Sequence, residues 1–111
     1  MNINVQNMNN IKNNENNLNV LRKVLRSPYS SQRQLALKLG FSLGKLNYCL
    51  KALKIRGLIK IVNFKNNSNK VNYFYALTPK GILQKTKLTI NFMKRKMKEY
   101  EELKREIDKN K

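Results

Sequence analysis

Hydrophobic residues recur at helical spacing soon after the start of the chain. The first stripe consists of Leu18, Leu21, Val24 and Leu25. It stops at the Ser27-Pro28 step, because proline disfavours a helical conformation in the residue before it. The pattern therefore predicts a first helix that begins near Leu18 and ends at this step.

Two shorter helices are predicted next. Ser31 and Gln34 have the spacing of a capping box, and Gly40 can adopt the left-handed conformation that ends a helix. The inner face of this helix would consist of Leu35, Ala36 and Leu39. Ser42 caps a third helix over 42–56, which ends at Gly57. Its apolar stripe consists of Leu43, Leu46, Leu50 and Leu53. Three short helices with a glycine turn between the last two are typical of a helix-turn-helix.

The periodicity changes after Gly57. Residues 58–64 and 71–77 are rich in Ile, Val, Tyr and Phe, which favour strands, and a polar, basic stretch separates them. We therefore expect a β-hairpin over 58–77, the wing of a winged helix. The predicted fold is mainly α with a small β-hairpin wing.

A long final helix follows the hairpin. Thr78 and Pro79 suit the cap and first position of a helix that could reach about Asp108, with at most a break near 86–89. Its apolar stripe consists of Ile90, Met93, Met97, Tyr100, Leu103 and Ile107. A stripe that extends beyond a small domain needs a cover, which predicts a homodimer through this helix.

The chain of 111 residues is long enough for one hydrophobic core. We expect the chain to be organised in three segments. Residues 1–17 are rich in Asn, have no helical stripe, and are predicted to form a flexible arm. Residues 18–81 form the predicted winged helix-turn-helix domain. Residues 82–111 form the predicted dimerisation helix.

The charge balance identifies the class of partner. Lys and Arg number 24 against 6 Asp and Glu, giving a net charge of +18. No carboxylate occurs from Asn16 to Lys98, whereas nineteen of the basic residues do. Such a surface favours nucleic acid or another anionic partner.

The same composition excludes several classes. The chain has no His and a single Cys, and its middle has no acid that could serve as catalyst or metal ligand, so we expect neither an enzyme nor a metal or other cofactor. Cys49 cannot form an internal disulfide and is expected to be a small buried hydrophobe. No apolar run reaches the roughly 18 residues of a membrane span. These features favour a cytoplasmic protein without membrane contact.

Helical projection predicts which residues of the third helix meet DNA. With its apolar stripe turned inward, the outward positions are Gly44, Tyr48, Lys51 and Ile55, and Lys45 and Asn47 lie on the flanks. The residues of this helix that are predicted to contact DNA are Ser42, Gly44, Lys45, Asn47, Tyr48 and Lys51. Asn47 can pair with adenine, whereas Lys51 can donate to guanine or to phosphate. The remaining predicted DNA contacts are Gln32 and Arg33 in the second helix and Lys65, Asn67, Asn69 and Lys70 in the wing.

The residues that carry a family resemblance occur in order along the chain. They are Ser-Gln-Arg-Gln-Leu-Ala at 31–36, Gly40, Ser-Leu-Gly-Lys at 42–45, Asn-Tyr-Cys-Leu at 47–50, Gly57-Leu58, Asn63-Phe64, Asn69-Lys70, Leu-Thr-Pro-Lys-Gly at 77–81 and Lys-Arg-Lys at 94–96. Over about 18–108 the chain resembles the MarR-type regulators associated with extracellular-polysaccharide gene clusters. The resemblance implies a dimeric bacterial transcription regulator that binds duplex DNA. The arm lies outside the match, and Asn69-Lys70 replaces the Asp-x-Arg wing motif of the wider family, so the planar guanidinium fork is missing there.

Two other functions remain open. The charge alone would suit a protein that binds RNA or DNA without sequence preference, although a single-strand reader needs exposed aromatic rings and only Tyr48 is predicted to point outward. A winged helix could also bind an acidic protein. The operator, the target genes, the sign of regulation and any small-molecule effector do not follow from the sequence.

Overall fold

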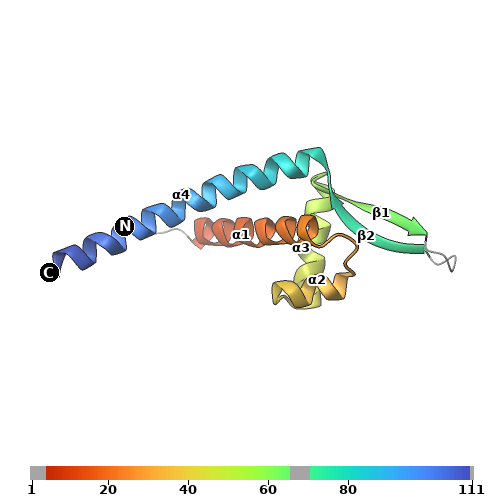
Figure 1. Ribbon diagram of the computed structural model, residues 1–111, viewed down its shortest axis with the longest axis horizontal. Helices are drawn as coiled ribbons and strands as arrows, with labels where there is room; N and C mark the ends of the chain where they lie inside the picture. The colour runs from red at the N-terminus through yellow and green to blue at the C-terminus, as the bar shows by residue number, and fades with distance from the viewer. Residues whose placement is uncertain (1–4, 66–70, 111) are drawn as a thin grey trace.

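The computed structural model of the chain describes residues 5–65 and 71–110. The elements follow in the order α1 (Val5–Arg26), α2 (Gln32–Leu39), α3 (Leu43–Ile55), β1 (Ile59–Lys65), β2 (Val71–Leu77) and α4 (Pro79–Lys109). Figure 1 shows α1 and α4 running in opposite directions and α2 and α3 packed on α1. The β1–β2 hairpin projects from the end of the molecule opposite the C-terminal end of α4. The predicted mainly helical fold with a two-stranded wing is confirmed.

The core lies where the three short helices meet the base of the hairpin. Its buried side chains are Leu18, Val20, Leu21, Val24, Leu35, Ala36, Leu46, Cys49, Leu50, Leu53, Leu58, Ile59 and Leu88. Leu39, Phe41, Tyr75, Leu77 and Phe92 pack against this cluster. The hydrophobic effect at these positions provides most of the driving force that holds helices, wing and the first half of α4 together.

Most of the predicted caps have the expected geometry. The Gln34 amide donates to Ser31 Oγ at 3.2 Å, and the Ser31 amide donates to Gln34 Oε1 at 2.8 Å, which completes the capping box. Gly40 has φ +67° and Gly57 has φ +73°, the left-handed region that glycine adopts without steric cost. The turns on both sides of α3 are therefore encoded locally.

The expectation of a flexible arm over 1–17 is wrong for residues 5–17, which belong to α1; residues 1–4 lie outside the described residues. Both predicted segment boundaries, at 17/18 and 81/82, fall inside helices. The flexible arm was predicted only from the small apolar surface that residues 1–17 can bury. A helix that is already anchored by Leu18 and Leu21 extends at low cost, and the Glu15–Arg95 ion pair at 3.6 Å ties this part of α1 to α4.

Two predicted core residues are not buried. Leu25 lies in the last turn of α1, where α1 and α4 have separated in Figure 1, and it is 49% exposed. Leu43 occupies the first position of α3, outside the layer of packed side chains, and is 43% exposed. Val20 and Cys49 are buried, although neither belongs to the stripes that predicted these helices.

The wing is joined to the helices by a compact junction. β1 and β2 pair antiparallel from Ile59 opposite Leu77 to Lys65 opposite Val71. At the base, Thr78 Oγ1 donates to the Gly57 carbonyl at 2.6 Å, and the Thr78 amide donates to the Leu58 carbonyl at 3.1 Å. Thr78 Oγ1 also accepts from the Gly81 amide at 3.0 Å as the N-cap of α4. One residue, Thr78, therefore connects the end of α3, the wing and the start of α4 through its side chain and its backbone amide.

The last helix is continuous. The break near 86–89 that the sequence allowed is absent from α4, which runs unbroken from Pro79 to Lys109. Thr86 Oγ1 donates to the Ile82 carbonyl at 3.1 Å and Thr89 Oγ1 to the Lys85 carbonyl at 2.7 Å, so both hydroxyls bond within the helix. The molecule measures 67 × 28 × 27 Å because α4 extends past the start of α1.

We predict that Gly81→Ala destabilises the fold by about 1–3 kcal/mol. A Cβ at this position would overlap the backbone carbonyl of Leu58, which cannot move without disturbing the wing. Urea unfolding followed by circular dichroism measures the effect. Gly44→Ala is the matched control: a Cβ there meets nothing within 4 Å, so the same substitution should leave stability unchanged or raise it. Equal stability of the two variants would contradict the close packing of Gly81 on the backbone of Leu58.

Candidate nucleic-acid interface

The start of α3 is held by a local cap and faces solvent. Ser42 Oγ accepts the Lys45 amide at 3.1 Å, which satisfies one of the free N–H groups at the helix end. Leu46, Leu50 and Leu53 anchor the opposite side of the helix in the core. The sequence-predicted residues Ser42, Gly44, Lys45, Asn47, Tyr48 and Lys51 are all exposed. They form one continuous surface, which we call the α3 surface.

A cleft flanks the α3 surface on the side of the wing. It has a volume of about 300 Å³ and is lined by Asn47, Leu50, Lys51, Lys54 and Tyr75. Asn47 and Lys51 are thus brought together with Lys54, which the sequence analysis did not select. Its position seven residues after Asn47, two helical turns on, was the signal that could have identified it.

A second cleft lies between α3 and the middle of α1. It has a volume of about 340 Å³ and is lined by Asn13, Asn16, Asn17, Lys45, Tyr48, Cys49 and Ala52. The three carboxamides come from the segment that was expected to be a flexible arm. Sequence reasoning missed them, because their place beside Lys45 and Tyr48 depends on the packing of α1 against α3.

The two predicted contacts in α2 differ in exposure. Arg33 is exposed and Gln32 is half-buried. Arg33 borders an apolar hollow of about 390 Å³ with Ala36, Leu37, Gly40, Phe41 and Leu43. Lys45 Nζ lies 4.0 Å from the centre of the Phe41 ring, a cation–π contact that holds this lysine beside the helix turn.

The predicted wing contacts lie at the edge of what the structure describes. Lys65 is the last residue of β1, and only its backbone is described. Asn67, Asn69 and Lys70 lie outside the described residues. Their proposed contact with DNA stays a prediction.

The exposed aromatic residues are more numerous than the sequence indicated. Tyr48 is exposed as predicted, but Tyr29, Tyr73 and Tyr100 are more than 60% exposed as well. The Tyr29 ring packs edge-on against Phe74 of the wing, with centroids 4.7 Å apart. The expectation that Tyr48 alone points outward is therefore wrong, and scarcity of exposed rings no longer counts against single-strand binding.

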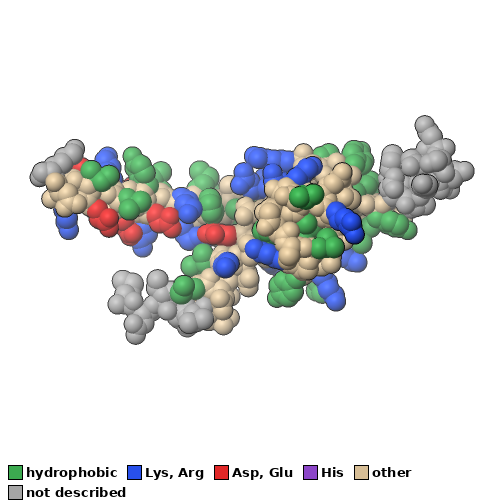
Figure 2. All heavy atoms as spheres, turned by 90° about the horizontal axis from the view of Figure 1, so that it is seen from below, with side chains coloured by type: hydrophobic (Ala, Val, Ile, Leu, Met, Phe, Trp, Pro, Cys, Tyr) green, Lys and Arg blue, Asp and Glu red, His purple; other side chains and the backbone are tan. Residues whose placement is uncertain are grey.

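Charge is segregated along the molecule. Figure 2 shows Lys and Arg side chains over the folded body, whereas the acidic side chains lie along the protruding part of α4. Lys96 pairs with Glu99 at 3.3 Å there. Among the described residues, Glu15 is the one acid that the folded body contributes, and it pairs with Arg95. The α3 surface therefore carries positive charge that no nearby carboxylate neutralises.

Cys49 is buried beneath the α3 surface. Burial raises the pKa of the Cys49 thiol above its ordinary value, and the nearby Lys45 ammonium opposes this only in part. The neutral thiol is therefore the favoured form in the folded chain, as the reading of Cys49 as a small hydrophobe requires. A redox switch would need the opposite shift.

Within residues 5–65 and 71–110 no group of three or more His, Cys, Asp or Glu side chains could hold a metal ion. In the same part of the chain, no helix combines the length and the apolar character that crossing a bilayer requires.

Comparison with known proteins agrees with this geometry. Residues 13–60 match the family model described as winged helix-turn-helix DNA-binding, which covers most of α1 and all of α2 and α3. No curated protein matches the sequence.

Several solved regulators share the fold. Staphylococcus aureus MarR in complex with salicylate and kanamycin superposes with a TM-score of 0.61 at 18% identity, covering 78% of this chain and 57% of that protein. Streptococcus pneumoniae FabT in complex with DNA superposes with a TM-score of 0.55 at 22% identity, covering 78% of this chain and 59% of that protein. The zinc-responsive MarR family member ZitR of Lactococcus lactis superposes with a TM-score of 0.55 at 24% identity, covering 78% of this chain and 58% of that protein. The chain thus spans less than two thirds of the length of these three proteins.

We predict that Cys49 reacts slowly with iodoacetamide at pH 8. Its burial and raised pKa should make alkylation at least about tenfold slower in the folded chain than in concentrated urea. The raised pKa also links folding stability to pH. The contribution of the neutral Cys49 thiol to the free energy of unfolding is fully present below the pKa that this thiol has in the unfolded chain. It is lost as the pH rises through the higher pKa of the thiol in the folded chain. Mass spectrometry of timed samples measures the rates. Equal rates in buffer and urea would contradict the burial of this thiol.

Proposed function

We propose that the chain is a MarR-type transcription regulator that binds duplex DNA through α3. The observation that carries the proposal is the α3 surface itself: a capped helix in a winged helix-turn-helix fold presents Lys45, Asn47, Tyr48 and Lys51 to solvent in a body almost free of acids. An exposed helix of this kind fits the major groove. Asn47 and Lys51 would contact base edges, whereas Lys45 and Lys54 would contact phosphates.

Structural neighbours support the same partner. FabT and ZitR have both been solved in complex with DNA, and both share this fold. The wing residues Lys65, Asn67, Asn69 and Lys70 would contact flanking backbone or minor groove, and Gln32 and Arg33 would contact phosphates at the start of α2. A regulator of this type would act in the cytoplasm. Its targets, from the family resemblance, would be genes for surface or extracellular polysaccharide.

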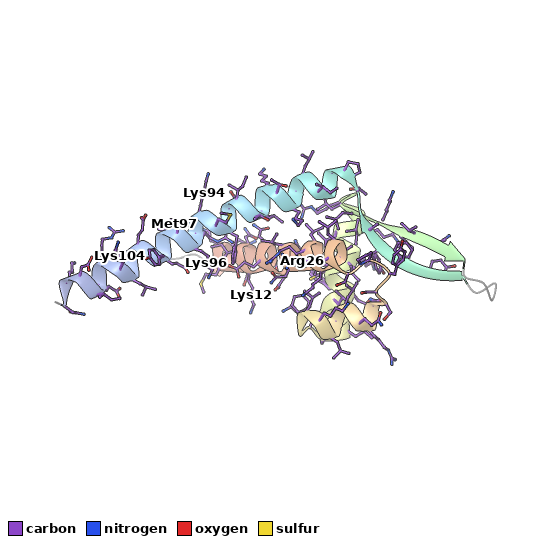
Figure 3. All side chains as sticks on the ribbon, viewed as in Figure 1. Lys12, Arg26, Lys94, Lys96, Met97 and Lys104 are labelled. Atoms are coloured by element: carbon purple, nitrogen blue, oxygen red, sulfur yellow. The ribbon has the colours of Figure 1, made fainter. Side chains whose placement is uncertain are left out.

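A homodimer through α4 is the second part of the proposal. Ile90, Met93, Met97, Tyr100, Leu103 and Ile107 are between 47% and 62% exposed, so their own chain does not cover them. At ~100° per residue, Ile90, Met93 and Met97 project away from the side of α4 on which Leu88 is buried and Arg95 reaches Glu15. Lys104, labelled in Figure 3, marks the part of the helix that extends past the start of α1. A second copy would cover this stripe and place two α3 surfaces on one duplex.

Two alternatives lead to different measurements. A protein that binds nucleic acid without sequence preference would use the same charge and the exposed tyrosines Tyr29, Tyr48 and Tyr73, and would bind structured RNA as tightly as duplex DNA. A module for an acidic protein would show no duplex binding even at low salt. Competition between duplex DNA and structured RNA distinguishes all three functions.

We predict that Asn47→Ala or Lys51→Ala lowers the preference for an operator over random duplex by ~1–3 kcal/mol per lost base contact. The operator comes from binding-site selection with the full chain, and fluorescence anisotropy gives both affinities. Lys109→Ala is the control, because it removes one exposed charge from the far end of α4, outside the apolar stripe. An equal loss on both duplexes would reassign the residue to phosphate contact.

Affinity for duplex DNA is expected to fall steeply with salt. If six or more phosphates are neutralised, the equilibrium constant drops by ~10³ or more between 50 and 200 mM salt, because bound counterions are released from the DNA. Anisotropy titrations over this range measure the slope. A flat response would rule out the basic surface as the main source of affinity.

The dimer is tested by placing charge on the α4 stripe. The double variant Met97→Lys/Tyr100→Lys is expected to raise the dimer dissociation constant by at least about a hundredfold, because two charges become buried without partners. Sedimentation equilibrium measures it. The control Glu102→Gln/Glu106→Gln changes the net charge of α4 by the same amount on the opposite side of the helix. A dimer that survives the first variant would place the interface elsewhere.

A further inference from the structure

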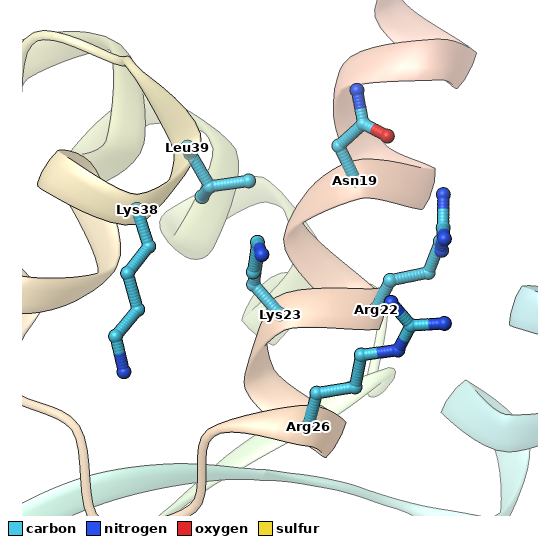
Figure 4. A pocket seen from close by; sticks show the side chains of 6 residues that line it. All are labelled: Asn19, Arg22, Lys23, Arg26, Lys38 and Leu39. Carbon is cyan, nitrogen blue, oxygen red and sulfur yellow. The ribbon is translucent and has the colours of Figure 1, made fainter.

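A second basic cluster surrounds a pocket between α1 and α2. The pocket has a volume of about 220 Å³ and is lined by Asn19, Arg22, Lys23, Arg26, Lys38 and Leu39 (Figure 4). All of these lining residues belong to α1 or α2, and α3 lies behind both helices in this view. The pocket is therefore separate from the α3 surface. We call it the α1–α2 pocket.

Three of the four cations lie on adjacent turns of α1. Arg22 and Arg26 are four residues apart, and like charges at this spacing destabilise a helix. Lys23 lies between α1 and Leu39 of α2 in Figure 4. Burial costs a cation part of its hydration, and both Arg22 and Lys23 are half-buried. This arrangement is unfavourable for the chain unless an anion joins it.

Lys38 adds a fourth charge from the opposite wall. Its Nζ donates to Ser30 Oγ at 3.1 Å, and Ser30 is buried in the loop between the two helices. The hydrogen bond fixes the ammonium beside the pocket and leaves two of its three protons for other acceptors. The cluster thus includes one positioned donor as well as flexible ones.

The chain supplies no carboxylate to this cluster. Among the described residues, none of Arg22, Lys23, Arg26 and Lys38 has an ion-pair partner. The nearest acid along α1 is Glu15, two turns before Arg22, and its carboxylate is paired with Arg95. Four cations around one cavity are therefore left with unsatisfied charge.

We propose that the α1–α2 pocket binds a small multivalent anion that bears phosphate groups. The arginine guanidinium groups match phosphate oxygens in a two-pronged geometry, the lysines add charge, and the Asn19 carboxamide can donate one further hydrogen bond. The phosphate is that of a free small molecule rather than of the DNA backbone, because the pocket lies between two helices and apart from the α3 surface. The site does not depend on the proposed function of α3.

Inorganic pyrophosphate is the probe for a calorimetric titration of the full chain without DNA, at constant ionic strength. We expect one saturable site per chain. Arg22→Gln/Arg26→Gln should weaken it by at least about tenfold, since each arginine loses charge-assisted hydrogen bonds. The control Lys98→Gln/Lys109→Gln removes two charges from exposed positions of α4 and should leave the affinity within about twofold, because distant exposed charges are screened.

Each other result overturns the proposal. Equal weakening in both double variants would mean diffuse attraction to a chain of net charge +18, and absence of saturation would mean that no site exists. Loss of duplex DNA affinity with unchanged pyrophosphate binding in the pocket variant would assign these cations to the DNA backbone. If circular dichroism shows that the double variant does not fold, Arg26→Gln replaces it. Arg26 is exposed, and its loss should weaken pyrophosphate binding by at least about threefold.

Discussion

The close approach of Gly81 to the backbone of Leu58 fixes the direction in which α4 leaves the folded body. Around it, Thr78 bonds the Gly57 carbonyl and caps α4, and Lys80 Nζ donates to the Arg56 carbonyl at 3.0 Å. Helix α3, the wing and α4 therefore share one rigid junction. The position of the α3 surface relative to the α4 stripe depends on these contacts together with the burial of Leu88 in the core.

The local features of the fold were predictable because each is encoded within a few residues. The capping box of Ser31 and Gln34, the left-handed Gly40 and the Thr78-Pro79 start of α4 need no distant partner. The outward face of α3 followed from projecting its apolar stripe, and all six residues selected there are exposed. Periodicity suffices where one side of an element is buried and the other is not.

Features that depend on tertiary packing were missed. The start of α1 at Val5, the exposure of Leu43 and the carboxamide-lined cleft beside Lys45 all follow from how separate helices meet. A poor helix former such as Asn continues a helix when residues further along anchor it. The α1–α2 pocket is another such feature, since Arg22 and Lys38 are sixteen positions apart in the sequence and come together only in space. The same applies to the exposed tyrosines, whose apolar sequence neighbours concealed their accessibility.

The unbroken length of α4 has a mechanical consequence. At ~1.5 Å per residue the helix is roughly 46 Å long, so a tilt of about 5° at its first turn would move its far end by about 4 Å. A single stiff rod amplifies small rotations, whereas two segments joined by a hinge would absorb them. The helix α4 thus acts as a lever arm. A rotation of a few degrees at the Gly81 junction displaces the C-terminal end of α4 by a distance comparable to the rise of one base pair.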